Sequence, residues 1–357
     1  MKTLSRFFSE KLNKLTPYTP GEQPKDMKYI KLNTNESPFR PTKKAIEKAA
    51  EAAQDLNLYP DPECRELTEK IAALLGVEYE EVLVTNGSDE ILNFAFMAFC
   101  DDKTGVAFPN ITYGFYPVFA ALNGIEYEEI PLKDDFTINI SDYFGLKKTI
   151  IIANPNAPTG IALTLSEIEE ILKNNPDNIV VIDEAYVDFG GTSSIPLIKK
   201  YDNLLVTQTF SKSRSMAGAR LGFGVGSKEV IKDLNTVKYS TNPYNINKMT
   251  MAAGIGILED NDAVLDNCQT IISNREFAKK ELENLGFIVT DSKANFLFAK
   301  SPDISGKELY LKLKENGILV RHFDKNEISD YNRITVGNID EMKALINAVK
   351  KILEENK

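Results

Sequence analysis

The sequence predicts an α/β protein with a large, mainly parallel sheet domain and a smaller α+β domain. Its 357 residues, of which 43% are hydrophobic, can bury one large core and a second, smaller one. Between residues 82 and 226, short apolar runs alternate with helical stretches, as in a parallel sheet covered by helices. Pro243 then breaks the chain before a long helical stretch. We therefore predict a large domain over residues 30–246 and a small domain formed by residues 1–29 and 247–357.

Two amphipathic helices are predicted ahead of the sheet. Residues 41–57 and 64–75 both carry apolar side chains at helical spacing. The apolar positions are Ala45, Ile46, Ala49, Ala50 and Ala53 in the first helix, and Leu67, Ile71 and Leu74 in the second.

The sheet strands are predicted from continuous apolar runs rather than from alternating ones. Such runs are typical of strands that are buried on both faces, which favours a parallel sheet. The predicted strands cover residues 82–84, 104–106, 149–153, 178–182, 204–207 and 222–225. In the small domain we predict helices over 247–258, 264–285 and 308–315 and strands over 296–298 and 332–336.

Composition excludes several classes of function. A net charge of −10 provides no basic surface for nucleic acid or an anionic membrane, and no apolar run is long enough to span a bilayer. The single histidine, His322, leaves no material for a His-rich metal site or a Ser-His-Asp triad. The three cysteines are scattered, which indicates the reducing cytoplasm and no metal site. We therefore expect small-molecule partners and chemistry based on lysine, carboxylates or a cofactor.

A lysine and an aspartate carry the predicted chemistry. Asp183 ends the apolar run that starts at Ile179, Tyr186 follows, and Lys212 comes after the next predicted strand. Since the carboxyl ends of neighbouring parallel strands meet at one edge of a sheet, these side chains should converge. Lys212 could then form an imine with the aldehyde of pyridoxal 5′-phosphate, while Asp183 faces the pyridine nitrogen. Tyr186 and Asn156 could serve the ring's O3′ oxygen.

The cofactor phosphate needs an anion site. Gly87, Ser88 and Asp89 follow a predicted strand and open a helix, whose N-terminal N–H groups favour anions. Ser211 adds a hydroxyl and Arg220 a guanidinium fork. In addition, Tyr113 could stack on the cofactor ring.

Two other interpretations fail on the sequence. An Asp-Glu pair after an apolar strand is also typical of an ATPase, but the chain contains no GxxxxGK[ST] phosphate loop. The glycines of residues 222–226 resemble a dinucleotide loop, but the third glycine is misplaced for GxGxxG. Close packing within a strand explains them better.

The motifs together resemble a known family. In order, they are Leu32-Asn-Thr-Asn-Glu-Ser-Pro-Phe39, Tyr59-Pro-Asp-Pro, Thr85-Asn-Gly-Ser-Asp-Glu90, Asn154-Pro-Asn-Ala-Pro-Thr-Gly160, Asp183-Glu-Ala-Tyr186, Ser211-Lys212, Arg220, Val320-Arg321 and Arg333-Ile-Thr-Val-Gly337. Over nearly its whole length the chain resembles the fold-type I aminotransferases that use pyridoxal 5′-phosphate, and among them the histidinol-phosphate aminotransferases. The resemblance implies an internal aldimine on Lys212 and a homodimer in which Tyr59 reaches the partner's cofactor phosphate.

The resemblance also implies a substrate. Arg333 would hold the anionic end of the substrate, Arg321 and Tyr18 would contact its phosphate, and Asn156 completes the predicted substrate site. The implied reaction is amino transfer between histidinol phosphate and 2-oxoglutarate in histidine biosynthesis. Two alternatives stay open, namely an aromatic amino acid aminotransferase and a lyase similar to threonine-phosphate decarboxylase.

Overall fold

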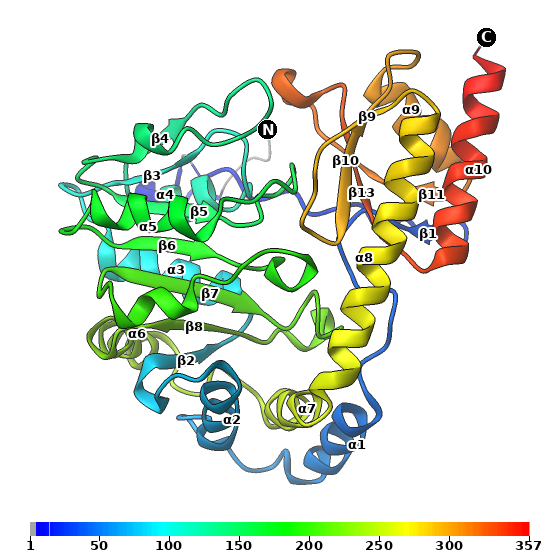
Figure 1. The fold of residues 1–357 in the computed structure, drawn as a ribbon. Helices are drawn as coiled ribbons and strands as arrows, with labels where there is room; N and C mark the ends of the chain where they lie inside the picture. The colour runs from blue at the N-terminus through cyan, green and yellow to red at the C-terminus, as the bar shows by residue number, and fades with distance from the viewer. Residues whose placement is uncertain (1–4, 14, 357) are drawn as a thin grey trace.

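The computed structural model describes residues 5–13 and 15–356 and contains a large and a small domain (Figure 1). The large domain contains a seven-stranded sheet in the order β2-β8-β7-β6-β5-β3-β4, in which β8 runs opposite to the other six strands. This confirms the predicted α/β class. The strands are β2 (Val82–Thr85), β3 (Val106–Pro109), β4 (Tyr127–Ile130), β5 (Thr149–Ala153), β6 (Val180–Asp183), β7 (Leu204–Thr209) and β8 (Gly222–Gly226).

The central strands are buried on both faces, as their continuous apolar runs predict. Successive side chains of a strand point to opposite faces, so each strand supplies two cores. Ile151, Val181 and Leu205 pack into the core on one face, and Ile150 and Ile152 into the core on the other. The helices around the sheet are α1 (Lys43–Ala52), α2 (Arg65–Leu75), α3 (Ser88–Phe99), α4 (Tyr116–Asn123), α5 (Leu165–Lys173), α6 (Lys228–Thr241) and α7 (Lys248–Leu258).

Some element boundaries differ from the predictions. The strand predicted at 104–106 is shifted to β3, because Asp101 accepts hydrogen bonds from the N–H groups of Lys103 and Thr104 and turns the chain there. The helix predicted over 41–57 ends at Ala52 and continues as a short 3-10 helix. The edge strand β4 was not predicted because three of its four residues are exposed and its sequence is largely polar.

The small domain is built on a four-stranded antiparallel sheet in the order β12-β13-β10-β9. Its elements are α8 (Asn261–Asn284), β9 (Ile288–Val289), β10 (Phe296–Lys300), α9 (Gly306–Glu315), β11 (Ile318–Leu319), β12 (Arg321–His322), β13 (Asn332–Thr335) and α10 (Ile339–Glu355). β1 (Ile30–Lys31) pairs in parallel with β11. Across the described residues, no helix is both long and apolar enough to cross a membrane.

The domain boundary at residue 246 stays a prediction, and the contacts lead us to propose a later one. α7 lies beyond this boundary but packs on α1 and α2 beside the large sheet (Figure 1). α8 runs from this region to the small sheet. At the other end, β1 lies inside the predicted large domain but pairs with β11 of the small one. We therefore propose a boundary within α8.

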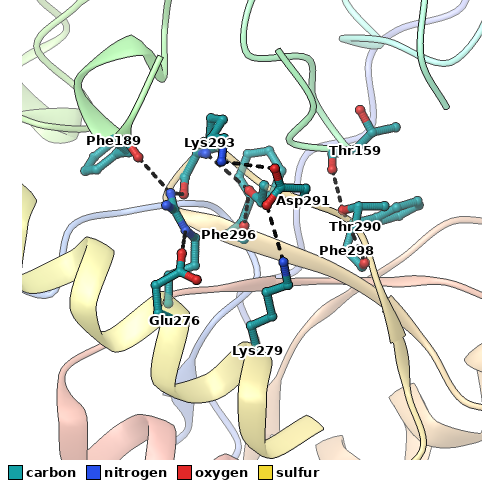
Figure 2. Close-up of polar contacts among 12 residues, drawn as sticks. Thr159, Phe189, Glu276, Lys279, Thr290, Asp291, Lys293, Phe296 and Phe298 are labelled. Atoms are coloured by element: carbon teal, nitrogen blue, oxygen red, sulfur yellow. Dashed lines mark hydrogen bonds and ion pairs between the residues drawn. The ribbon is translucent and has the colours of Figure 1, made fainter. Parts of the chain in front are cut away.

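The two domains meet at the loop between β9 and β10 (Figure 2). Thr290 Oγ1 of this loop donates a hydrogen bond to the Thr159 carbonyl at 2.6 Å. Arg275 of α8 donates to the carbonyl of Phe189 at 2.7 Å. Thr159 and Phe189 each lie just after a central strand, so these bonds hold the small domain against loops at the carboxyl edge of the sheet.

Gly160 allows the loop between β9 and β10 to approach the large domain closely. We therefore expect an alanine at this position to destabilise the protein. The Lys293 N–H donates to the Gly160 carbonyl at 2.8 Å. Gly160 has φ +77, and an added Cβ would lie 2.2 Å from Ser292 Oγ. We expect Gly160→Ala to lower the free energy of unfolding by about 2–4 kcal/mol through backbone strain and overpacking.

Gly76 provides the matched control. Its φ is +68, but nothing lies within 4 Å of an added Cβ. Gly76→Ala should therefore cost only the backbone strain, about 1–2 kcal/mol. Urea unfolding of the two variants measures the difference, and equal losses would show that the contact with Ser292 does not hold the domains closely.

Candidate active site

A cavity opens at the carboxyl ends of β6 and β7, and we call it the central cavity. It brings together most of the predicted catalytic and cofactor-binding residues although they are far apart in the sequence. The predicted residues that line it are Ser88, Asp89, Tyr113, Asp183, Tyr186, Ser211, Lys212 and Arg220.

Lys212 lies in this cavity without a carboxylate partner. Its Nζ donates a hydrogen bond to the Thr34 carbonyl at 3.3 Å and lies 5.7 Å from the centroid of the Tyr186 ring. Among the described residues it forms no ion pair. A lysine amine held this way is available to an electrophile, which is the arrangement a Schiff-base lysine needs.

Asp183 is a buried carboxylate with hydroxyl partners. It ends β6, is 4% exposed, and accepts hydrogen bonds from Tyr116 Oη at 2.9 Å and Thr207 Oγ1 at 3.2 Å. Burial raises the pKa of Asp183 to about 6. Because no cation among the described residues pairs with it, a protonated pyridine nitrogen would stabilise its charged form.

Tyr186 is held by a residue to which the sequence analysis assigned no role. Asn35 Nδ2 donates to the Tyr186 hydroxyl oxygen at 3.0 Å. The Asn35 backbone has φ 55 and its N–H donates to Thr335 Oγ1 at 2.9 Å. Asparagine tolerates this left-handed conformation. The Tyr186 hydroxyl therefore still has its own hydrogen to donate.

The predicted phosphate site forms at the N-terminus of α3. Gly87 has φ +74, and an added Cβ would lie 2.6 Å from Arg220 Nη2, so only glycine leaves this space. Arg220 Nη2 bonds Asp89 Oδ2 at 3.0 Å, and Arg220 Nη1 donates to Ser211 Oγ at 3.3 Å. A guanidinium, a hydroxyl and a helix N-terminus thus face one space.

Tyr113 forms a wall of the same cavity. Its hydroxyl donates to Asp89 Oδ1 at 2.9 Å, and its ring packs edge-on to Tyr116 with centroids 5.6 Å apart. Burial and the Asp89 carboxylate raise the pKa of Tyr113, so its phenol stays neutral. A fixed aromatic ring in this place suits the predicted stacking on a cofactor.

The glycines of β8 allow close packing, as predicted, and do not form a dinucleotide-binding loop. An added Cβ at Gly222 would lie 2.5 Å from the backbone nitrogen of Ser88, and one at Gly224 would lie 2.0 Å from Ile91 Cδ1. The strand therefore needs glycine so that α3 can approach it.

Asn156 is buried near the site, but its amide hydrogens are engaged. Its Nδ2 donates to the Ile111 carbonyl at 2.9 Å and to Thr159 Oγ1 at 3.1 Å, while its Oδ1 accepts from Thr112 Oγ1 at 2.8 Å. It does not line the central cavity. To donate a hydrogen bond to a cofactor, Asn156 would have to break one of its two Nδ2 hydrogen bonds. Its predicted contact with the cofactor and the substrate therefore stays a prediction.

A second cavity adjoins the central one and contains three cationic side chains, and we call it the cationic cavity. Tyr113 and Ala157 line both cavities. The cationic cavity is lined by the predicted substrate residues Tyr18, Arg321 and Arg333 and by Lys325, which the sequence analysis missed.

Arg333 is a partly buried cation of this second cavity. Its guanidinium lies between the rings of Phe296 and Phe323, at 5.4 and 5.8 Å from their centroids. Its Nη2 donates to the Asn33 carbonyl at 3.1 Å, whereas its buried Nε has no partner among the described residues. Burial lowers the pKa of Arg333. Both observations favour an anionic ligand here, since it would satisfy and stabilise the guanidinium.

The other cations are tied to the backbone around them. Arg321 donates to the carbonyls of Thr19 and Pro20, both at 3.2 Å, and so fixes the segment that carries Tyr18. Lys325 Nζ donates to the Asn110 carbonyl at 2.7 Å. No motif in the sequence singles out Lys325.

Tyr59 and His322 line neither of the two cavities. Tyr59 is 80% exposed and stacks on Tyr244 with ring centroids 4.6 Å apart. His322 stacks on Tyr310, and burial lowers its pKa. The structure therefore does not bring Tyr59 into the site of its own chain.

A mainly parallel sheet that brings a lysine and a buried aspartate to one cavity beside a helix N-terminus is the arrangement expected of a fold-type I aminotransferase. Sequence comparison gives the same class: the family model described as Aminotransferase class I and II matches residues 27–349. The chain belongs to this family and, within it, to the histidinol-phosphate aminotransferases.

A full-length relative supports this assignment, and solved structures share the fold. Histidinol-phosphate aminotransferase from Brachyspira hyodysenteriae is 50% identical over 355 residues, which cover 98% of this chain and 100% of the relative. The crystal structure of histidinol-phosphate aminotransferase from Clostridium acetobutylicum has a TM-score of 0.83 and 25% identity, with 91% of this chain and 99% of that chain covered. The enzyme from Sinorhizobium meliloti, solved in complex with pyridoxal-5′-phosphate, shares the fold with a TM-score of 0.84 and 21% identity over 92% of each chain.

Proposed function

We propose that this aminotransferase transfers an amino group between histidinol phosphate and 2-oxoglutarate, with pyridoxal 5′-phosphate on Lys212, as a step of histidine biosynthesis. One observation carries the proposal. The cavity that holds the unpaired Lys212 and the buried Asp183 adjoins a second cavity that holds Arg321 and Arg333. A cofactor aldehyde and a phosphorylated substrate would therefore have adjacent sites.

The residues of the central cavity fit the cofactor. Asp183 would face the pyridinium nitrogen, Tyr113 would stack on the ring, and Tyr186 would donate its free hydrogen to the ring's O3′ oxygen. Ser88 at the N-terminus of α3, Ser211 and Arg220 line the same cavity and would hold the cofactor phosphate. When bound, pyridoxal phosphate supplies an electron sink that stabilises negative charge at the substrate's Cα.

Lys212 would hold the cofactor covalently until the amino substrate displaces it. Its free Nζ is the group on this chain that would take the proton from the substrate's Cα and give it to the carbon at the other end of the imine. The Thr34 carbonyl, 3.3 Å from Nζ, orients the amine. The return half with 2-oxoglutarate, which releases glutamate, would use the same groups in the opposite order.

The cationic cavity suits a phosphate dianion. Two arginines match a phosphate better than one, because each presents a planar fork of donors. Arg333 Nε is the group that most needs an acceptor. The names of the full-length relatives support the same substrate.

We place the enzyme in the cytoplasm as a homodimer. Its cysteines are unpaired, as expected for a reducing compartment. Leu56, Leu58 and Tyr59 are 55, 59 and 80% exposed, and Tyr244, stacked on Tyr59, is 43% exposed. Contiguous exposed apolar side chains mark interaction surfaces. This patch would bind a second copy of the chain and deliver Tyr59 to the partner's cofactor phosphate.

Assays with histidinol phosphate and 2-oxoglutarate test the substrate, with Arg333→Ala as the diagnostic variant. We expect glutamate formation by the wild type and a loss in kcat/KM of about 100-fold in the variant, because a charge-assisted contact is removed. Unphosphorylated histidinol should show little change. Arg40→Ala, at an exposed position that lines neither cavity, is the control.

Other outcomes would identify the alternatives. Turnover of phenylalanine without turnover of histidinol phosphate would indicate an aromatic amino acid aminotransferase. Release of carbon dioxide from a phosphorylated amino acid would indicate a lyase. An equal loss with both histidinol substrates would show that Arg333 does not hold the phosphate.

A further inference from the structure

Tyr116 connects two walls of the central cavity without lining it. It is the first residue of α4 and is 0% exposed. Its hydroxyl donates to Asp183 Oδ2 at 2.9 Å, and its ring contacts that of Tyr113 edge-on, at an interplanar angle of 86°. One side chain therefore contacts both the residue predicted to face the ring nitrogen and the residue predicted to stack on the ring.

We propose that Tyr116 is a positioning residue that holds the Asp183 carboxylate toward the cofactor's ring nitrogen and fixes the Tyr113 ring against the cofactor's face. This inference deepens the proposed function and rests on it.

The hydrogen bond from Tyr116 keeps Asp183 both charged and oriented. Burial disfavours the carboxylate, and the like charge of Asp89 on α3 acts in the same direction. Tyr116 and Thr207 favour the charged form of Asp183, because both donate a hydrogen bond to its carboxylate. Tyr116 donates to Oδ2 and Thr207 to Oδ1. Burial and Asp183 also raise the pKa of Tyr116, so its phenol stays a donor. Without the Tyr116 hydroxyl, Asp183 Oδ2 would lose this hydrogen bond and the pKa of Asp183 would rise further.

Tyr143 shows that a buried tyrosine in this protein does not need such a partner. It is 1% exposed, and its hydroxyl has no hydrogen-bond partner among the described residues. Tyr116→Phe and Tyr143→Phe thus remove the same atom from equally buried sites, but only the first removes a bond to Asp183.

The test is the affinity of the cofactor-free protein for pyridoxal 5′-phosphate, titrated across the acid and neutral range. The pyridinium requires an ionised Asp183, so affinity should fall as pH drops through the pKa of that group. Removing a donor raises this pKa, so in Tyr116→Phe the midpoint should move to higher pH. Near pH 6 we expect an affinity loss of about 10-fold, the equivalent of one hydrogen bond to a charged group, and a smaller loss in mildly alkaline solution. Tyr143→Phe should keep the wild-type profile.

A double-mutant cycle separates positioning from a general effect on folding. In an Asp183→Asn background, Tyr116→Phe should cause little further loss if Tyr116 acts through Asp183. An unchanged pH profile in Tyr116→Phe, or an equal loss in both backgrounds, would overturn the inference. By contrast, a wild-type protein that binds no pyridoxal 5′-phosphate would overturn the proposed function itself.

Discussion

Replacing Lys212 with alanine is expected to abolish amino transfer, lowering kcat by about 10⁴-fold or more, because a nucleophile and a proton-transfer group are lost together. The structure supports this expectation through the position of Nζ, which lies 5.7 Å from the Tyr186 ring and has no carboxylate partner among the described residues. The variant should also lose the visible absorbance of lysine-bound cofactor. Stopped assays of glutamate formation and an absorbance scan measure both effects.

Lys232→Ala is the control for this variant. Lys232 is exposed on α6 and lines neither the central nor the cationic cavity. It should keep wild-type rate and absorbance. If Lys212→Ala retained substantial activity and the visible band, the lysine that carries the chemistry would have to lie elsewhere.

Replacing Asp183 with asparagine should produce the second largest effect, a fall in kcat of about 10²–10³-fold together with weaker cofactor binding. The amide keeps the size of the side chain but cannot carry the negative charge that stabilises a protonated pyridine. In the protein without cofactor, burial raises the pKa of Asp183 to about 6, so binding of the cofactor should weaken as pH falls through that value. The charged form predominates above this pKa, so binding that depends on it should be complete at neutral pH and decline in acid.

Glu184 is a neighbouring buried carboxylate that does not line the central cavity, and it serves as the control for Asp183. It is 2% exposed and accepts hydrogen bonds from Ser193, Ser194 and Gln208. Glu184→Gln should therefore lower the free energy of unfolding while the folded variant keeps its cofactor affinity. If Asp183→Asn lost stability but bound pyridoxal 5′-phosphate as tightly as the wild type, Asp183 would be structural too.

Most of the fold follows from local sequence patterns. The continuous apolar runs of β5, β6 and β7 predict a sheet buried on both faces because no solvent-facing positions interrupt them. β4 was not predicted, because an exposed edge strand has no continuous apolar run. The reversed direction of β8 was also missed, since apolar content does not encode strand direction.

The sequence predicted those site residues that belong to motifs with a recognisable chemical role. Asp183 ends β6 and Lys212 follows β7, and both strands end at one edge of the sheet, so the sequence could predict their convergence. Tyr116 and Asn35 act through contacts across 67 and 151 residues of sequence, respectively, and only the folded chain reveals such pairs. Lys325 likewise reaches the cationic cavity through tertiary packing.

Locating the bound cofactor tests most directly whether Lys212 carries the chemistry. Wild-type protein would be incubated with pyridoxal 5′-phosphate, reduced with borohydride to convert the lysine linkage to a stable amine, digested and analysed by mass spectrometry. The phosphopyridoxyl group should be found on the peptide that contains Lys212, in stoichiometric amount. A label on another lysine, or an active enzyme that retains no label, would contradict it.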